Sequence, residues 1–343
     1  MLGDLRFQNK IRFLNAVSIA WVVLMHANSL YLYPGLENLS GGAFAAFFQN
    51  FLCFNLAEMG VPLMFAISGF LFYGGLNREK LPQKLTRRAR TLLVPYLIWN
   101  GLYYFAFLFL SRLGIQGLLT QSMEFSIPGL LRGILLHSMN PSGWFLMQLI
   151  LFAAVSPLLL PLLDWSRGGG ILLFGVLLFH FIGKPIPYLR TDALVYYLIG
   201  ALAARQLPEQ VILRGGRGRQ LLGLLLFFCY EMGFYLSLPG GAAVPSVLLR
   251  SLLLVGVWLL ADGLDFSRVK APFSHTFFVY LAHMLPLGAL RILFFRLLPN
   301  NPLGAMGSFL FPAAGAIFCC LGVARIMTRF CPGLFSILTG DRS

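Results

Sequence analysis

The sequence predicts an all-α fold, a polytopic bundle of about ten transmembrane helices with both termini in the cytoplasm. Of its 343 residues, 58% are hydrophobic and only 11% are charged, and the mean hydropathy is +0.78. Apolar stretches of about 18 residues or more recur along the chain, and each is long enough to cross a hydrocarbon core of about 30 Å as a helix. We therefore expect residues 1–343 to form a single integral-membrane domain.

Ten candidate spans follow one another along the chain. They cover residues 12–33, 43–74, 91–111, 143–163, 170–188, 192–205, 219–238, 244–262, 273–297 and 303–328. The first lacks the short apolar core and the small-residue cleavage site of a secretory signal, so a retained helix is expected. The second is too long for one crossing, and Gly60 with Pro62 predicts a break into an interfacial and a spanning piece. Turn-forming residues separate later spans, as in NPSG before the fourth, LPGGAAVP before the eighth and LPNNP before the tenth.

The positive charge of the chain follows this topology. The net charge is +14, with 26 Lys and Arg residues. If the amino terminus is cytoplasmic, 19 of these 26 fall in the segments that face inward, which are residues 1–12, 75–90, 164–169, 205–219, 262–272 and 325–343. Because this distribution meets the positive-inside rule, we expect membrane lipid rather than nucleic acid around the basic residues. The five cysteines have no metal-ligand spacing, so neither a metal site nor a disulfide is predicted.

A histidine lies deep inside the first span, IRFLNAVSIAWVVLMHANSLYLY. At about 100° per residue, His26 shares a helix face with Asn15 and Arg12. Arg12 is about 21 Å away along the helix axis, which is too far for contact. Ionisable groups inside a bilayer usually face the bundle interior or an aqueous cavity. Two interpretations stay open: a neutral histidine that hydrogen-bonds a neighbouring helix, or a general base or nucleophile.

The connector NREKLPQKLTRRARTLLVPYLIW is strongly basic. Pro82 can begin a helix, after which Lys84, Arg87 and Arg88 occupy adjoining positions of one face and Arg90 lies one turn beyond Arg87. Such a cluster suits a ligand with several phosphates, because guanidinium groups bind phosphate bidentately. The alternatives are a topology signal alone and contact with anionic lipid headgroups.

Two other ionisable residues are predicted near mid-membrane. Glu231, in FFCYEMGFYL, is either the partner of an Arg or His on another helix or a proton-handling group, and we favour a structural partner. His283, in FVYLAHMLPLG, is followed by Pro286 one turn later. It either packs in the core or lines a site.

The order of these motifs resembles the membrane-bound acyltransferase-3 family. The pieces are VVLMHAN, VPLMFAISGFLF, RRARTLLVPY, GWFLMQLILFAAVSPLL and, late in the chain, FSHTFFVYLAH. The resemblance implies a ten-helix enzyme of the bacterial inner membrane that moves an acyl group, often acetyl, from cytoplasmic acyl-CoA to a hydroxyl. The acceptor would be a cell-envelope glycan or a lipid-linked molecule. It implies acyl-CoA as co-substrate and no tightly bound cofactor.

The resemblance also implies roles for particular residues. The histidine of the family's first helix matches His26, and its cytoplasmic Arg-x-x-Arg pair matches Arg87 and Arg90. The Ser-Gly-Phe stretch of its second helix begins at Ser68 here. Ser68, or a backbone N–H freed near Gly69, is a candidate for stabilising the oxyanion of acyl transfer.

The first helix departs from the family pattern. Many members place an arginine eleven positions before the histidine, where this chain has Asn15, and an acidic residue three positions earlier, where it has Arg12. Either the arginine has moved one turn towards the cytoplasm or its role is lost. The resemblance therefore leaves the acceptor open.

These residues suggest a mechanism. Arg87 and Arg90, with Lys84 and Arg88, would hold the phosphates of CoA at the cytoplasmic face. His26 would either deprotonate the acceptor hydroxyl or carry the acyl group as an acyl-imidazole. Sequence alone does not separate these two routes.

A transporter is the alternative from another functional class. Arg12, Glu231, His26 and His283 could form a proton relay in an exporter of envelope glycans or in a proton-coupled carrier. Transporters commonly show duplicated halves with interrupted helices in matching places, and that symmetry is not visible in the sequence. A non-catalytic membrane scaffold is a third, weaker alternative.

Overall fold

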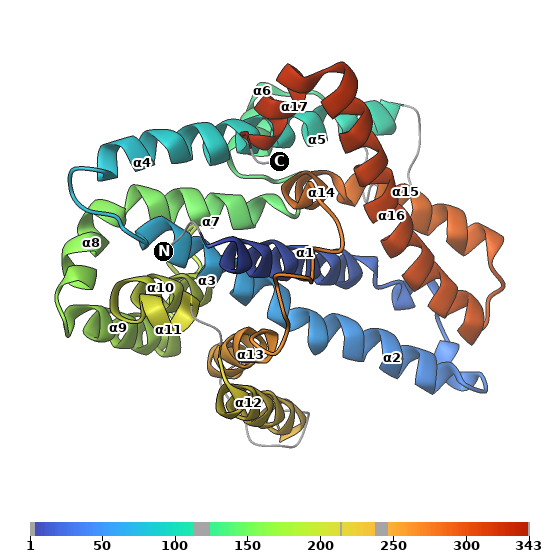
Figure 1. Ribbon diagram of the computed structural model, residues 1–343. Helices are drawn as coiled ribbons and strands as arrows, with labels where there is room; N and C mark the ends of the chain where they lie inside the picture. The colour runs from blue at the N-terminus through green and yellow to red at the C-terminus, as the bar shows by residue number, and fades with distance from the viewer. Residues whose placement is uncertain (1–3, 113–123, 213–214, 237–245, 342–343) are drawn as a thin grey trace. The chain divides into compact units, whose positions relative to one another are not determined.

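The computed structural model describes residues 4–112, 124–212, 215–236 and 246–341. These ranges contain helices and turns, and no β-strand beyond an isolated bridge between Ile186 and Leu189. The predicted all-α class is therefore confirmed (Figure 1).

The helices alternate between long apolar segments and short turns. Those of the first half are α1 (Leu5–Ala27), η1 (Leu30–Leu32), η2 (Leu36–Asn38), α2 (Gly42–Phe54), η3 (Leu56–Met59), α3 (Gly60–Tyr73), α4 (Leu81–Arg88), the π-helical η4 (Ala89–Leu93), α5 (Val94–Arg112), α6 (Ile127–Leu135), α7 (Gly143–Ala154), α8 (Ser156–Asp164) and α9 (Gly168–Ile182). Those of the second half are α10 (Thr191–Gln206), α11 (Pro208–Ile212), α12 (Arg217–Leu236), α13 (Ser246–Ala261), α14 (Thr276–Ala282), α15 (Met284–Leu297), α16 (Pro302–Phe330) and α17 (Pro332–Thr339).

Over the described residues, each of the ten predicted spans coincides with a helix or with consecutive helices. The predicted LPGGAAVP connector and the adjoining ends of the seventh and eighth spans lie outside the described residues. Four helical stretches are long and apolar enough to cross a membrane by themselves, namely Leu5–Leu32, Gly42–Tyr73, Leu81–Arg112 and Pro302–Phe330. Two more qualify as broken spans, because α7 and α8 meet at 64° and α14 and α15 at 61°. The chain is therefore a polytopic integral membrane protein. The count of about ten crossings, which also includes shorter apolar helices such as α9 and α13, and the side on which the termini lie stay predictions.

The predicted break in the second span is present. Helix α2 ends at Phe54, the turn η3 follows, and α3 begins at Gly60. Pro62 lies in the first turn of α3, where its missing N–H would have no helical partner in any case.

The described residues group into two compact units. The first unit comprises residues 1–18, 58–85 and 151–273, and includes α3 and α8 to α13. The second unit comprises residues 19–57, 86–150 and 274–343, and includes α2, α5, α6 and α14 to α17. Helices α1, α4 and α7 contribute residues to both.

Glycines let α3 and α10 approach closely within the first unit. A Cβ atom on Gly200 would lie 1.9 Å from the carbonyl oxygen of Ala66, and one on Gly69 would lie 2.1 Å from the carbonyl oxygen of Tyr197. Small residues at such contacts are typical of helix pairs in membranes, where close backbone approach supplies the van der Waals attraction. A larger side chain at either glycine would force the two helices apart.

A buried group of charges joins the start of α1 to the end of α13 in the first unit. Lys10 Nζ lies 2.5 Å from Asp262 Oδ1, and both side chains are buried. Arg219 Nη2 lies 3.0 Å from Asp262 Oδ2. The Lys10 ammonium also lies over the ring of Trp258, 3.8 Å from its centroid. One carboxylate therefore balances two cations.

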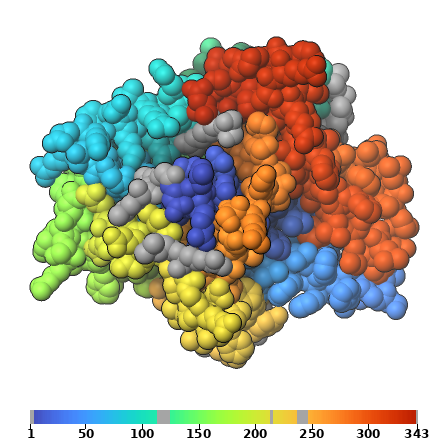
Figure 2. Space-filling view, viewed as in Figure 1, coloured from blue at the N-terminus to red at the C-terminus, as the bar shows by residue number. Residues whose placement is uncertain are grey.

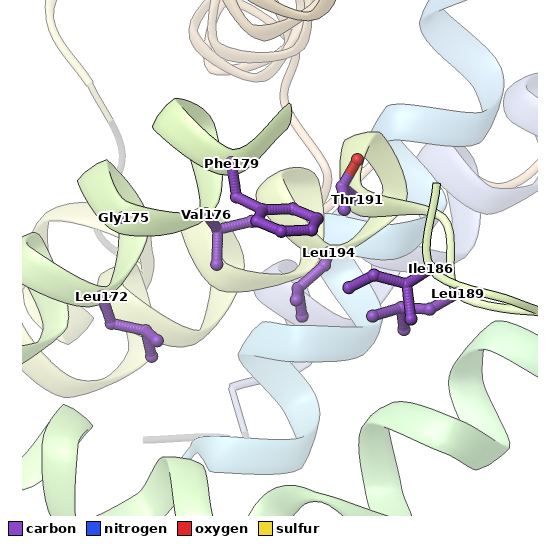
Figure 3. A pocket seen from close by; sticks show the side chains of 8 residues that line it. All are labelled: Leu172, Gly175, Val176, Phe179, Ile186, Leu189, Thr191 and Leu194. Carbon is purple, nitrogen blue, oxygen red and sulfur yellow. The ribbon is translucent and has the colours of Figure 1, made fainter. Parts of the chain in front are cut away.

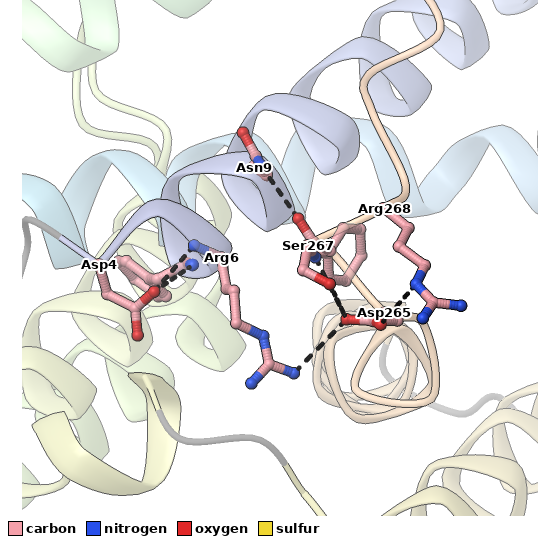
Figure 4. A network of polar contacts seen from close by, with 8 residues as sticks. Asp4, Arg6, Asn9, Asp265, Ser267 and Arg268 are labelled. Carbon is pink, nitrogen blue, oxygen red and sulfur yellow. Dashed lines mark hydrogen bonds and ion pairs between the residues drawn. The ribbon is translucent and has the colours of Figure 1, made fainter.

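A second, more exposed network is centred on Asp265 (Figure 4). Arg6 and Arg268 each place a guanidinium nitrogen 3.8 Å from a carboxylate oxygen of Asp265. Asn9 Nδ2 donates a hydrogen bond of 2.9 Å to the carbonyl oxygen of Phe266. The contacts join residues 1–12 to residues 262–272, two segments that the charge pattern places on the same side of the membrane.

The surface of α12 is apolar. Its large side chains are exposed over several turns, and they include Leu221, Leu222, Leu224, Leu225 and Phe228. The helix lies at the molecular surface in the yellow part of Figure 2. A soluble protein rarely exposes so continuous an apolar face, so we interpret it as a surface in contact with lipid.

In the second unit, α16 contacts α2, α14, α15 and α17, while α17 contacts α5. The segment that follows α1 is tied to this group. Tyr33 Oη lies 2.6 Å from Ser308 Oγ on α16, and Gln49 Nε2 donates to the carbonyl oxygen of Ala305 at 3.0 Å. These contacts fix the carboxyl end of α1, where His26 lies.

Candidate active site

Two histidines from distant parts of the chain lie side by side in the second unit. His26 is at the end of α1, and His283 lies at the bend between α14 and α15. Their ring centroids are 5.5 Å apart and the ring planes are tilted by 36°. His283 is fully buried, whereas His26 is partly exposed. His26 is thus the more exposed residue of the pair.

Pro286 explains the bend at His283. Proline has no N–H to donate to the carbonyl of Ala282, four residues earlier, and its ring crowds that carbonyl. The helix therefore breaks between α14 and α15. At this break, the His283 side chain contacts the carbonyl oxygens of the preceding turn.

The contacts of His283 define its tautomer. Its Nδ1 lies 2.8 Å from the carbonyl oxygen of Tyr280 and 3.2 Å from that of Val279. A carbonyl oxygen can only accept, so Nδ1 carries the hydrogen and Nε2 of the neutral ring holds a lone pair. This Nε2 is buried, and among the described residues it has no hydrogen-bond partner.

Tyr280 links His283 to the connector before α7. Its hydroxyl donates to the carbonyl oxygen of Ser142, and its ring packs on that of Phe145 with centroids 5.5 Å apart. In the same connector Asn140 Nδ2 donates to Asn100 Oδ1 of α5 at 3.0 Å. Tyr280, whose carbonyl oxygen accepts from His283, is therefore itself held by a hydrogen bond and a ring contact to this connector.

His137 lies in the same connector and is partly buried. Its backbone has a φ of 47°, and removal from water lowers the pKa of its imidazole below the ordinary value. His137 is therefore neutral at pH 7.

Arg291 completes the surroundings of His26. Its Nη1 donates to the carbonyl oxygen of His26 at 3.3 Å, and its guanidinium lies 5.3 Å from the ring centroid of Tyr31. A cation at this position stabilises the carboxyl end of α1. Sequence reasoning did not identify this contact, because it joins residues that are 265 positions apart in the chain.

The basic connector forms the predicted helix, which continues into a π-helical segment. Helix α4 begins at Leu81 and ends with Arg87 and Arg88, and Arg90 lies in η4. Arg87 and Arg90 are exposed and Arg88 is partly buried. Segments of π-helix are frequent at functional sites, because the wider turn changes the direction of its side chains.

Lys84 has a different environment from the arginines. Its ammonium donates to the carbonyl oxygens of Leu71 at 3.2 Å, of Phe72, and of Gly74 at 3.5 Å, at the end of α3. A cation there satisfies carbonyls that a helix end leaves without partners. The structure thus gives Lys84 a capping contact, and its predicted contact with phosphate stays a prediction.

The carboxyl-terminal helix supports the segment that carries Arg90. Gly340, which ends α17, has a φ of +59°, and a Cβ there would lie 2.6 Å from the Cα of Thr91. Trp99 Nε1 on α5 donates to the carbonyl oxygen of Leu338 at 3.0 Å. Glycine is required at position 340 because the backbone is left-handed and touches the η4 backbone.

The remaining predicted residues belong to the first unit. Arg12 is exposed there, while Asn15, Ser68 and Glu231 are partly buried. Helix α3 runs without a break through Gly69, so the helix itself uses the N–H groups that the sequence had suggested for an oxyanion, which corrects that expectation.

The first unit also contains an ion pair that sequence reasoning did not identify. Arg250 of α13 pairs with Glu58 before α3, and both side chains are less than a third exposed. Glu231, for which an Arg or His partner was expected, lies on the neighbouring α12. The partner expected for Glu231 stays a prediction.

A pocket in the first unit lies between α9 and the start of α10 (Figure 3). Its lining is apolar apart from the hydroxyl of Thr191, which lies 2.8 Å from His180 Nδ1. No titratable side chain lines it. It has the character of a lipid-facing recess and none of the groups that acid–base chemistry needs.

The fold and the site define an all-α integral membrane protein with a pair of adjacent histidines, one of them fully buried, and an exposed pair of arginines. The chain belongs to the acyltransferase-3 family: the family described as Acyltransferase domain (Acyl_transf_3) matches residues 9–325. A curated relative is the succinoglycan biosynthesis protein ExoH of Rhizobium meliloti (strain 1021). It is 26% identical over 317 residues, which cover 85% of this chain and 82% of the relative. No solved structure matches the chain. The protein is therefore a membrane-bound acyltransferase.

Proposed function

We propose that the protein transfers an acetyl group from cytoplasmic acetyl-CoA to a hydroxyl of a cell-envelope polysaccharide, in the inner membrane of a bacterium. The family membership supports acyl transfer. The similarity to a succinoglycan biosynthesis protein supports a glycan acceptor. The single observation that carries the proposal is the pairing of His26, a partly exposed residue, with the fully buried imidazole of His283 inside a membrane-embedded helical protein.

The chemistry requires only one proton to be moved. A ring nitrogen of His26 takes the hydrogen of the acceptor hydroxyl while the oxygen attacks the thioester carbonyl carbon. The carbon–sulfur bond then breaks, the ester is complete, and the proton passes from His26 to the sulfur of CoA. An acyl-imidazole on His26 is the alternative route, in which the acyl group is transferred twice.

The arginines are proposed to bind the donor. Arg87 and Arg90 are exposed, lie three positions apart, and can each offer a bidentate pair of N–H donors to phosphate. Acyl-CoA carries several phosphates on a part of the molecule that does not react. Binding energy from that part holds the thioester in place.

Purified protein in lipid nanodiscs tests the proposal. It is incubated with acetyl-CoA labelled in the acetyl group, with and without an envelope polysaccharide bearing free hydroxyls. We expect label in an alkali-labile ester on the polysaccharide. If the label stays on CoA over a series of acyl chain lengths and acceptors, while the protein moves glycan across a vesicle membrane, the protein is a transporter and the proposal is wrong.

Arg87→Ala is expected to raise the KM for acyl-CoA by roughly 10- to 100-fold. The loss of one charge-assisted hydrogen-bonded contact costs about 1.5–3 kcal/mol, and the chemical groups at His26 are untouched, so kcat should change little. The matched control is Arg78→Ala, an exposed arginine of the same connector. Equal KM values for the two variants would show that Arg87 serves topology or lipid contact instead.

Gly340→Ala is expected to affect the same binding step indirectly. Alanine in a left-handed conformation costs about 1–2 kcal/mol, and its Cβ would displace Thr91 next to Arg90. The KM for acyl-CoA should rise and the thermal unfolding temperature should fall. Gly333→Ala is the control, since Gly333 lies on α17 with open space around it. If Gly340→Ala matches this control in both measurements, α17 does not support the arginine segment.

A further inference from the structure

The proposed reaction uses His26 but leaves the second imidazole of the pair without a role. We propose that His283 is a positioning residue: its Nε2 accepts a hydrogen bond from one ring N–H of His26 and so directs the lone pair of His26 towards the acceptor hydroxyl. This inference rests on the proposed function. The inference adds a role for His283, which is to select the tautomer of His26, the proposed base.

The first support is the tautomer of His283 itself. The carbonyl oxygens of Tyr280 and Val279 keep its hydrogen on Nδ1, so Nε2 is a hydrogen-bond acceptor by necessity. The ring is fully buried, and its Nε2 has no partner among the described residues. An acceptor so deeply buried is costly to leave unsatisfied, which favours a partner that reaches it during turnover.

The second support is distance. Two imidazoles that share an N–H···N hydrogen bond have ring centroids about 5 Å apart, since a donor–acceptor distance of about 3 Å adds to the two ring radii. The observed separation is 5.5 Å. Hydrogen bonds of catalytic groups are often long or poorly aligned before substrate binds and tighten in the complex. The proposal requires the His26 ring to turn so that one of its N–H groups meets Nε2 of His283.

The third support is charge, which indicates whether His283 orients His26 or takes up the proton itself. His283 has no exposure to solvent, and the guanidinium of Arg291 lies at the carbonyl of its neighbour His26. A charge on His283 would have no contact with water, so His283 stays neutral. His26 takes the acceptor proton on its free nitrogen, keeps its other N–H directed at His283, and releases the proton to the sulfur of CoA.

Two substitutions separate the two contacts of His283. His283→Asn keeps an N–H donor for the Tyr280 carbonyl and removes the distal acceptor, whereas His283→Gln places an amide oxygen close to the position of Nε2. We expect kcat to fall about 100-fold in His283→Asn and to stay within about tenfold of the wild type in His283→Gln. The loss expected for His283→Asn is smaller than the loss caused by removing a charged orienting group from a catalytic triad. The KM for acyl-CoA should be unchanged in both.

A spectroscopic readout tests the hydrogen bond without relying on activity. The protein in nanodiscs is labelled with ¹⁵N-histidine, and the His26 signals are assigned by their loss in His26→Gln. We expect one His26 tautomer in the wild type and in His283→Gln, and a mixture of tautomers in His283→Asn. Thermal unfolding of each variant reports whether it is folded.

The outcomes are distinct. Full activity of His283→Asn, or an unchanged His26 tautomer in a folded His283→Asn protein, overturns the inference while the acyltransferase proposal stands. Equal loss in the Asn and Gln variants also overturns it, because the acceptor at Nε2 would then not be what matters. A wild-type protein that transfers no acyl group overturns the proposed function, and the tautomer measurement still decides whether His283 orients His26.

Discussion

His26→Gln is expected to lower the rate of acyl transfer by at least about 10²–10⁴-fold, the usual contribution of general-base catalysis. Glutamine retains polarity and similar volume, but it cannot accept a proton at neutral pH or carry an acyl group. His26 is partly exposed, and Arg291 donates to its backbone carbonyl oxygen rather than to its side chain. The substitution should therefore leave the helix in place. The measurement is acetyl transfer by equal amounts of purified variant in nanodiscs.

His180→Gln is the matched control for this variant. His180 is also an imidazole on an apolar helix, and its Nδ1 lies 2.8 Å from the hydroxyl of Thr191 in the first unit. Its replacement should leave the transfer rate unchanged. Activity of His26→Gln near that of His180→Gln would remove His26 from the mechanism and return it to packing.

The sequence predicted the helices well because the signal for each is local. An apolar stretch of spanning length must satisfy its backbone groups internally, so it is a helix wherever it lies in the membrane. Breaks were predictable for the same reason: Gly60 and Pro62 mark the end of one helix and the start of another. The bend beside His283 likewise follows from Pro286.

Contacts between distant residues were not predictable in this way. His26 and His283 were both identified as unusual, yet no local pattern indicates that two residues so far apart in the chain lie 5.5 Å apart. Nothing in the sequence around Arg291 pointed to a contact with His26. Its contact with His26 depends on the bend that aligns α15 with the end of α1.

The environment of Lys84 also shows that local spacing does not predict contacts with distant residues. Its spacing from Arg87 and Arg88 placed it in a phosphate-binding cluster. In the structure its ammonium meets the last carbonyls of α3, a contact that the spacing did not predict. Spacing on a helix gives the direction of a side chain, but the neighbouring helix end decides what that side chain binds.

Asp262→Asn is expected to lower the free energy of unfolding by about 3–5 kcal/mol, the usual cost of breaking a buried ion pair by removing one partner. Asp262 is 4% exposed and balances Lys10 at 2.5 Å and Arg219 at 3.0 Å. Without the carboxylate, Lys10 would be left as a buried cation with the ring of Trp258 and a carbonyl oxygen as its remaining contacts. Arg219 is partly exposed and can extend towards water.

Asp265→Asn provides the control, because it makes the same chemical change a few residues away in a more exposed network (Figure 4). Its ion pairs with Arg6 and Arg268 are 3.8 Å long and solvent-accessible, so about 0–1 kcal/mol should be lost. Unfolding of both variants in detergent, followed by tryptophan fluorescence, measures the difference. A double variant, Lys10→Met with Asp262→Leu, should recover much of the loss, since it removes both buried charges of the closest pair and leaves Arg219 able to reach solvent. Equal stability of Asp262→Asn and Asp265→Asn would mean that water reaches Lys10, and the start of α1 would then not be held by a buried charge pair.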